Sequence, residues 1–307
     1  MNNFTLNTPV AFLIFNRPET TEQVFEEIRK ANPKKLFVVA DGPRPNNQKD
    51  IEGCEAARKI INKVDWDCEV MKNYSNVNLG CKKRVSSGIT WVFENTNEAI
   101  FLEDDCLPHQ SFFRFCQELL NYYRNDERIM MISGDNFQDG KMVTNNSYYF
   151  SSYSHIWGWA SWKRAWQKYD VEMKLWPFIR ETKYLDYWLS NKKALAHWEE
   201  EFRRLYNNKI DTWDFQFLFA CWINQGLSIL PQVNLVSNIG FGTGASHTGD
   251  GNKKASNIPV KEIIFPLKHP EIVMRNLEAD MYEEENYILL PLHRRIGRRI
   301  KSFFAKN

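Results

Sequence analysis

The feature that most constrains the fold is an alternation of short apolar runs with segments of helical periodicity. Val10 to Phe15 and Leu36 to Ala40 are continuous apolar runs of strand length. Between them, Thr20 to Lys30 carries its apolar residues at helical spacing. Strands without polar alternation are buried on both faces, which is typical of a parallel sheet covered by helices on both sides. The first forty residues therefore predict an α/β fold.

The same alternation continues to about residue 135. We expect, in this order, a helix over 51–64, a strand over 68–71, a helix over 82–93, a strand over 99–102, a helix over 111–123 and a strand over 129–132. Beyond residue 150 the alternation fades, and we expect helices only at Tyr184 to Leu205 and Asp214 to Asn224. These patterns predict one domain over residues 1–255, with halves that meet near residue 135, and a C-terminal extension over 256–307.

Composition and charge exclude several classes of protein. The chain is 43% apolar and 25% charged, which supports a packed core and excludes a disordered chain. A net charge of +2 gives no reason to expect a nucleic-acid partner. The six cysteines show no CxxC pair, so we expect reduced thiols rather than a zinc site or a disulfide framework. Without a signal peptide or about 18 consecutive apolar residues, we expect a cytoplasmic protein with no membrane span.

Polar side chains follow three of the predicted strands at the point where each strand ends. They are Asn16-Arg17, Asp41 and the triplet Glu103-Asp104-Asp105. Ligands of open parallel sheets bind outside the carboxyl ends of the strands, so we expect these groups to share one site. Adjacent carboxylates suit a hard divalent cation, which takes one or two protein carboxylates and fills its other positions with phosphate oxygens and water. A solvated acidic turn before the helix at Ser111 is the alternative.

Five stretches, in the same order, resemble the N-acetylglucosaminyltransferase I group of glycosyltransferases. They are Asn16-Arg17, Asp41, the acidic motif at 99–105 with Ser111-Phe112-Phe113, Trp213-Asp214, and the loop Phe241 to His247. The chain departs from the group at Asn16, where the group carries aspartate, and at Cys106, where it carries leucine. The resemblance implies a GT-A-like nucleotide-diphospho-sugar transferase fold, with a Rossmann-like, mostly parallel sheet flanked by helices. It also implies an inverting, metal-dependent glycosyltransferase, with a UDP-sugar favoured as donor.

The resemblance also implies roles for single residues. Residues 1–135 would bind the nucleotide sugar through Arg17, Asp41 and Asp104, with Ser246 on the diphosphate. Asp105 would ligate Mn²⁺ or Mg²⁺, and His247 would join it on the metal or bind a phosphate. The alternative for His247 is a plain loop histidine. Residues 136–255 would bind the acceptor, a glycan or a lipid-linked molecule.

Asp214 is the expected catalytic base, because an acceptor hydroxyl is a poor nucleophile until its proton is removed. Asp211, three residues earlier, is the rival base. A helix N-cap is the structural alternative for Asp214, since this residue opens an amphipathic segment.

An aromatic segment and a basic segment lead to predictions about acceptor binding and membrane contact. Trp159, Trp162 and Trp166 have the spacing of one buried helix face, whereas the loop at Trp157 is expected to bind the acceptor. His293 to Lys306 is basic, with apolar residues on one helical side. This segment predicts either peripheral contact with an anionic membrane or a helix that packs on the protein.

Two other functions remain open at the level of sequence. A nucleotidyltransferase would share the sheet and the metal-binding carboxylates, but it would usually carry a glycine-rich basic turn after the first strand. Phe15-Asn16-Arg17-Pro18 contains no glycine, which also disfavours a dinucleotide site. A carbohydrate-binding protein without turnover is the second alternative.

Overall fold

The computed structural model describes residues 4–189, 191–240 and 254–289. The strands are β1 (Val10–Ile14), β2 (Lys35–Ala40), β3 (Glu69–Tyr74), β4 (Glu98–Glu103), β5 (Cys106–Pro108), β6 (Ile129–Ser133), β7 (Tyr148–Ser151), β8 (Trp159–Trp162), β9 (Leu227–Pro231) and β10 (Val236–Asn238). The longer helices are α1 (Pro18–Ala31), α2 (Gln48–Ile60), α3 (Gly80–Asn95), α4 (Gln110–Tyr122), α8 (Lys192–Tyr206) and α9 (Asp214–Ile223). The shorter helices are α5 (Lys163–Trp166), α6 (Trp176–Glu181), α7 (Tyr184–Trp188) and α10 (Leu277–Glu283), with single turns η1 (Ile61–Lys63) and η2 (Glu284–Ile288).

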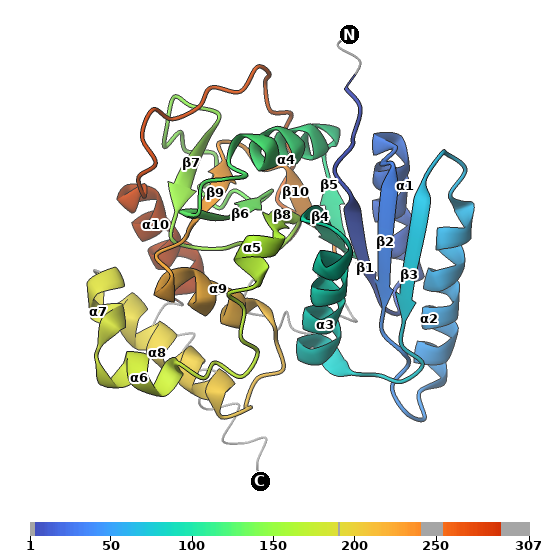
Figure 1. Ribbon diagram of the computed structural model, residues 1–307, viewed down its shortest axis with the longest axis horizontal. Coiled ribbons are helices and arrows are strands. Elements are labelled where there is room, and N and C mark those ends of the chain that lie inside the picture. Colours follow the sequence, from blue (N-terminus) through green and yellow to red (C-terminus); the bar gives the residue numbers. More distant parts are fainter. Residues whose placement is uncertain (1–3, 190, 241–253, 290–307) are drawn as a thin grey trace.

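Eight of the strands form one twisted sheet in the order β3-β2-β1-β4-β8-β6-β9-β7 (Figure 1). Strands β1 to β4 are mutually parallel, and β6 and β9 run in the same direction, while β8 and β7 are antiparallel to their neighbours. The predicted α/β class, a mostly parallel sheet flanked by helices, is confirmed. Register places Ile14 opposite Ala40 and Leu13 opposite Glu103, so the carboxyl ends of β1, β2 and β4 lie side by side.

The two faces of the sheet carry separate hydrophobic cores. Alternate residues of β1 point to opposite sides, as a pleated strand requires, and none is more than slightly exposed. Phe12 packs with α1, α2 and α4 on one face, whereas Ala11 and Leu13 pack with α3, α5 and α9 on the other. The continuous apolar runs of the sequence therefore reflect burial on both faces.

Helix α1 shows how local sequence sets the ends of these elements. Pro18 stands in its first turn, where a missing N–H costs nothing. Asn32 ends the helix in the left-handed conformation, with a φ of 51°, and its N–H is donated to the carbonyls of Ile28 and Arg29.

A third cluster joins α6, α7, α8 and α9 at the lower left of Figure 1. Its centre is formed by Trp198, Phe202 and Trp222, whose rings make edge-on and tilted contacts 5.4 to 5.6 Å apart. This helical layer lies beside the sheet and belongs to the second half of the chain.

Two predictions for the second half are wrong. Trp159 and Trp162 lie on strand β8, in the middle of the sheet, and they face opposite cores instead of one helix face. The helix expected over Tyr184 to Leu205 is two helices, α7 and α8. Leu189 is extended, and the Asn191 side chain accepts the N–H groups of Lys193 and Ala194, which starts α8 afresh.

Residues 256–289, the described part of the predicted extension, contact both halves of the chain. The His269 ring stacks on Tyr122 of the first half, with ring centroids 4.2 Å apart. In the second half, His269 Nδ1 lies 2.8 Å from the Tyr148 hydroxyl, and Glu283 Oε2 lies 2.9 Å from His155 Nε2. Arg275 donates to the carbonyl of Trp188 on α7. The segment therefore covers the β7 edge of the sheet.

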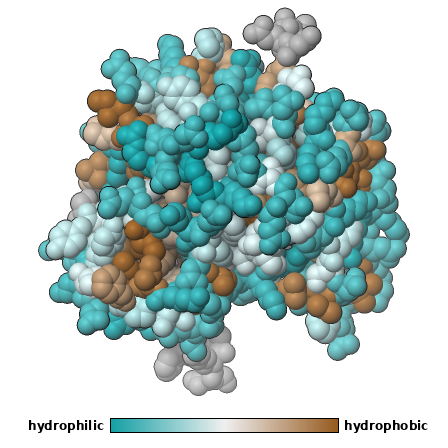
Figure 2. Space-filling view, in the orientation of Figure 1, coloured by the Kyte–Doolittle hydropathy of each residue, from teal (hydrophilic) through white to brown (hydrophobic). Residues whose placement is uncertain are grey.

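The visible surface is mostly hydrophilic, with separated hydrophobic patches (Figure 2). Among the described residues, no helix combines the length and apolar character needed to span a bilayer. All six cysteines are free thiols, four of them buried. The basic segment His293 to Lys306 lies outside the described residues, so its predicted membrane contact stays a prediction.

Candidate active site

A cleft of about 470 Å³ opens at the carboxyl ends of β1, β2 and β4. It brings together the side chains that the sequence placed at three strand ends with the two rival bases at the start of the helix predicted from residue 214. They are Arg17, Asp41, Glu103, Asp104 and Asp105 in the first group and Asp211 and Asp214 in the second. Ile156 and Trp157 line the same cleft. These groups therefore line one cleft, as expected, and the role of each stays a prediction.

The acidic triplet lies where β4 turns into the short strand β5. Glu103 is the last residue of β4, and Asp104 and Asp105 form the turn. Asp104 is buried, and its Oδ2 accepts the N–H of Phe15, 2.9 Å away, from the end of β1. The Asp105 carbonyl accepts the N–H of Ile239, which follows β10. These bonds fix the triplet between the sheet and the β5–β10 ribbon.

Arg17, in the turn after β1, pairs with two carboxylates of the triplet. Its Nη1 lies 2.5 Å from Asp105 Oδ2 and 3.8 Å from Asp104 Oδ1. Asn16 beside it donates to Asp50 Oδ1 at 2.7 Å, and the Arg44 guanidinium is bonded to the same carboxylate. Asp50 on α2 thereby holds the β1–α1 turn in place.

Gly240 approaches this ion pair so closely that a side chain would fit only if the Asp105 carboxylate moved. A Cβ built on Gly240 would lie 2.0 Å from Asp105 Oδ2 and 2.8 Å from Arg17 Nη1. The requirement for glycine here comes from close approach to the pair, and sequence reasoning did not identify it.

The surroundings of Glu103 and Asp104 raise the pKa values of both carboxyls and so favour their protonated forms. Burial, followed by the charges of Asp105 and Asp104, raises the pKa of Glu103 to about 8. Burial and the charge of Asp105 also raise the pKa of Asp104, against the effect of Arg17. A further positive charge in the cleft would favour the ionised forms of these groups.

The residues at this point fit a hard divalent cation. Every donor of the triplet is a carboxylate oxygen, and Glu103 Oε1 is buried with no hydrogen-bond partner among the described residues. No cluster of three or more His, Cys, Asp or Glu side chains that could hold a metal occurs in the described part of the chain. An ion would therefore depend on one or two carboxylates, with Asp105 foremost, and on ligand oxygens.

Asp41 lines the cleft, but its oxygens already accept several hydrogen bonds. The N–H groups of Gly42, Leu79 and Gly80 and the amide of Asn78 all donate to its carboxylate, at 2.9 to 3.2 Å. Asp41 thus holds the turn before α3. Contact with a nucleotide base stays a prediction.

The two rival bases have different partners. Asp211 Oδ2 and Oδ1 accept the N–H groups of Cys81 and Lys82 at the start of α3, each at 3.1 Å. Asp214 is the first residue of α9, where the sequence expected a helix to begin, and its carboxylate accepts the Thr212 hydroxyl. Both aspartates line the cleft, and the role of catalytic base stays a prediction for each of them.

The backbone of the Trp157 loop is hydrogen-bonded to the buried side chain of Asp135. Asp135, at the carboxyl end of β6, accepts the Trp157 N–H at 3.1 Å, and the Phe137 ring packs edge-on against Trp157 at 5.5 Å.

His109 caps α4, where its Nδ1 accepts the Ser111 N–H. Ser246 and His247 lie outside the described residues, so their predicted roles stay predictions.

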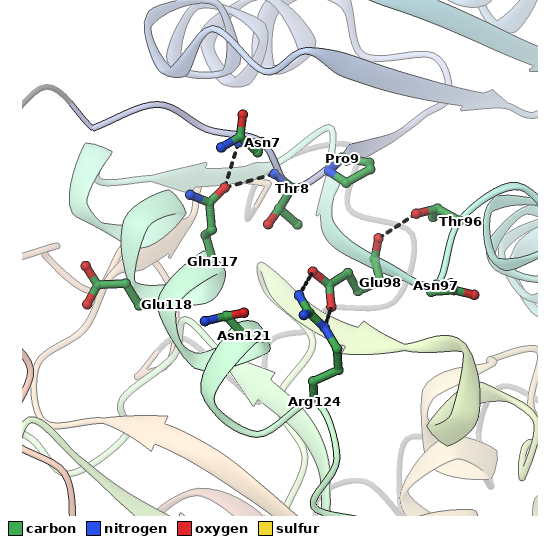
Figure 3. A pocket seen from close by; sticks show the side chains of 10 residues that line it. All are labelled: Asn7, Thr8, Pro9, Thr96, Asn97, Glu98, Gln117, Glu118, Asn121 and Arg124. Atoms are coloured by element: carbon green, nitrogen blue, oxygen red, sulfur yellow. Dashed lines mark hydrogen bonds and ion pairs between the residues drawn. The ribbon is translucent and has the colours of Figure 1, made fainter.

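A second hollow of about 700 Å³ lies at the opposite edge of the sheet, where β1 and β4 begin. Figure 3 shows Gln117 bonded to the backbone of Asn7 and Thr8, and the Arg124 guanidinium paired with Glu98. None of the predicted site residues that the structure describes lines this hollow, and its Gln117 side chain ties the N-terminal segment to α4.

Comparisons with known proteins identify solved structures that are remote from this chain in sequence. No protein-family model matches the chain, and no curated protein is similar to it in sequence. Among solved structures, a mannosyltransferase from Pyrobaculum calidifontis, in complex with GDP-Man and Mn²⁺, is 12% identical, with a TM-score of 0.36 over 52% of this chain and 45% of that chain.

Two further solved structures are similarly remote. A UDP-glucose pyrophosphorylase complexed with UDP-glucose is 11% identical, with a TM-score of 0.29 over 49% of this chain and 64% of that chain. Mouse xyloside xylosyltransferase 1 is 10% identical, with a TM-score of 0.33 over 70% of this chain and 81% of that chain. The chain thus spans less than two thirds of the first two proteins. Both sugar-transferring and nucleotide-transferring enzymes are among these neighbours, but at this level of likeness their activities do not extend to this chain.

Proposed function

We propose that the protein is a glycosyltransferase that moves a sugar from a nucleoside-diphosphate sugar to a hydroxyl group of an acceptor. The observation that carries the proposal is the composition of the cleft. One wall holds Arg17 and the Glu103-Asp104-Asp105 triplet, and the start of α9 brings Asp214 to the same space. The charged leaving group needs a cation, and the acceptor hydroxyl needs a base, so one cleft must hold both kinds of partner.

The donor's diphosphate would lie at the triplet and Arg17. Asp105, supported by Asp104, would hold Mn²⁺ or Mg²⁺, and a bound cation would neutralise the charge that develops on the departing diphosphate. Arg17 is a second cation beside the same carboxylates, 2.5 Å from Asp105, and its guanidinium suits a phosphate oxygen. Ser246 and His247 are proposed to meet the diphosphate from the loop beyond Gly240.

The reaction would be a single displacement. The Asp214 carboxylate accepts the proton of the acceptor hydroxyl as the acceptor oxygen bonds to the anomeric carbon. The bond from that carbon to the diphosphate oxygen breaks at the same time, and a nucleoside diphosphate leaves. Attack opposite the leaving group inverts the anomeric centre.

Acceptor binding is proposed for the side of the cleft lined by Ile156 and Trp157. An indole face suits the apolar face of a sugar ring, and Asp135 fixes the backbone that presents it. A glycan or a lipid-linked sugar is the proposed acceptor. A lipid-linked acceptor would agree with membrane contact through residues 293–306.

Binding of nucleoside diphosphates tests the proposal without knowledge of the acceptor. We would measure thermal unfolding with UDP, GDP, dTDP and their sugars, with Mn²⁺ and with EDTA. A ligand at 100 times its Kd should stabilise the protein by about 2.7 kcal/mol. Stabilisation that needs Mn²⁺ and disappears in Asp105→Ala is expected. Equal stabilisation of both proteins, or none by any nucleotide, would contradict the site.

A further inference from the structure

The loop between α8 and α9, which leads directly into Asp214, is hydrogen-bonded to α3 in the other half of the chain. Asp211 accepts the N–H groups of Cys81 and Lys82, 130 and 129 residues away in sequence. The Lys82 ammonium donates to Asn208 Oδ1 at 3.0 Å. The first N–H groups of a helix have no partner within that helix, so a carboxylate from outside satisfies them well.

Gly80 makes this contact possible. It lies in the left-handed region, with a φ of 78°, and a Cβ at this position would come within 2.9 Å of Asp211 Oδ2. The Gly80 N–H is meanwhile donated to Asp41. The start of α3 therefore meets two carboxylates, Asp41 from the first half of the chain and Asp211 from the second.

The loop is fixed on its other side by the core. Trp213 is only 1% exposed, and its ring stacks on Trp159 at 5.6 Å. Asn207, Asn208 and Lys209, at the start of the loop, are exposed. Asp214 thus follows a short segment that is held by the Trp213 ring at one end and by Asp211 at the other.

We propose that Asp211 is a positioning residue, which sets the place of the Asp214 carboxylate by fastening its loop to α3. The inference rests on the proposed function, in which Asp214 is the base. Asp211 itself would not touch the acceptor, since both of its oxygens are bonded to backbone N–H groups. Misplacement of a reacting group by about 1 Å can lower a rate by up to roughly 10²-fold.

The kinetic test compares Asp211→Ala and Asp211→Asn with Asp214→Asn and with the Asp211→Ala/Asp214→Asn double variant. Asp211→Ala should lower kcat for transfer about 10-fold or more, with the Kd for the nucleoside diphosphate changed less than about 2-fold. Asp211→Asn should recover part of the rate, because its carbonyl oxygen still accepts one N–H. The double variant should be no slower than Asp214→Asn alone, because Asp211 acts through Asp214.

Asp170→Ala is the matched control. Asp170 also accepts two backbone N–H groups, those of Glu172 and Lys174, but it does not line the cleft. Its variant should keep the wild-type kcat. A loss in both alanine variants, or a further loss when Asp211→Ala is added to Asp214→Asn, would overturn the positioning role.

Hydrogen exchange supplies a readout that needs no activity. In Asp211→Ala the amides of Cys81 and Lys82 should exchange faster than in wild type, and in Asp170→Ala they should not. Unchanged exchange at these two amides would contradict the hydrogen bonds that join Asp211 to the start of α3. If transfer cannot be detected in the wild type, or is undiminished in Asp214→Asn, the proposed function fails, whereas the exchange result still decides the contact.

Discussion

Replacing Gly240 by alanine should damage the candidate site far more than it damages the fold. The new Cβ would lie 2.0 Å from Asp105 Oδ2 and 2.7 Å from its Cγ, whereas comfortable contacts are about 3.5 Å. The carboxylate must therefore move by about 1.5 Å, which breaks its 2.5 Å contact with Arg17. Metal–carboxylate distances of about 2.1 Å do not tolerate such a displacement.

The cost in stability should be modest, because the clash is with the end of one side chain. An off-rotamer aspartate costs about 0.5–1.5 kcal/mol, and loss of a partly exposed ion pair costs up to about 1 kcal/mol. We therefore expect the free energy of unfolding to fall by about 1–2 kcal/mol. The affinity for a nucleoside diphosphate with Mn²⁺ should fall about 10-fold or more, equivalent to about 1.4 kcal/mol.

Calorimetry and urea unfolding on the same preparations would measure both quantities. Ser237→Ala is the matched control, since Ser237 lies on the same ribbon, opposite Leu107, and does not line the cleft. It should bind as wild type does. Wild-type affinity in Gly240→Ala would refute the placement of the diphosphate and metal beside Asp105, and an equal loss in the control would trace the effect to the ribbon.

Three other variants test separate parts of the account. Asp214→Asn should keep the affinity for donor nucleotide and lose transfer by roughly 10²-fold or more, and full transfer in this variant would remove Asp214 from the mechanism. Asp105→Ala should lose Mn²⁺-dependent nucleotide binding with little change in the unfolding midpoint, and retained binding by calorimetry would argue against the metal site. Hydrogen bonds from Arg44 lower the pKa of Asp50 to about 2, below its ordinary value. The ionised Asp50 carboxylate therefore stabilises the folded protein fully above about pH 4, and this contribution is lost as the pH falls toward 2. Asp50→Asn should therefore cost about 1–2 kcal/mol at pH 6 and much less at pH 2.5, in urea unfolding, and an equal cost at both pH values would contradict that assignment.

The first half of the fold could be predicted because four of its strands, β1, β2, β4 and β6, are buried on both faces. Such strands appear as continuous apolar runs, and the polar residue that ends each run marks the carboxyl edge of the sheet. Arg17, Asp41 and Asp105 were found in this way, and all three line the cleft.

The second half was harder to predict because its strands are short and several run antiparallel. Trp159 to Trp162 has two large residues three apart, a spacing that also fits a helix. Its pairing with β4 and β6, which lie before it in sequence, decides in favour of a strand. This information is non-local, so no window of sequence contains it.

The supporting contacts of the site were also beyond sequence reasoning. Nothing near Asp211 indicates that it meets the start of α3, and nothing near Gly240 indicates that it lies against Asp105. Glu103 was part of a recognised triplet, but only the fold shows that one of its oxygens is buried without a partner among the described residues. Residue types identified the candidate site, whereas tertiary contacts determined how each group is held.

The central claim, transfer of a sugar from a nucleoside-diphosphate sugar, is tested most directly by the nucleotide product. The protein would be incubated with Mn²⁺ and a panel of nucleotide sugars, and the nucleotides would be separated by chromatography, with and without added pyrophosphate. The account predicts slow release of a nucleoside diphosphate from at least one donor, lost with EDTA and in Asp105→Ala. Formation of a nucleoside triphosphate that depends on pyrophosphate would identify a nucleotidyltransferase instead. Turnover of no donor, together with binding of none, would contradict the account.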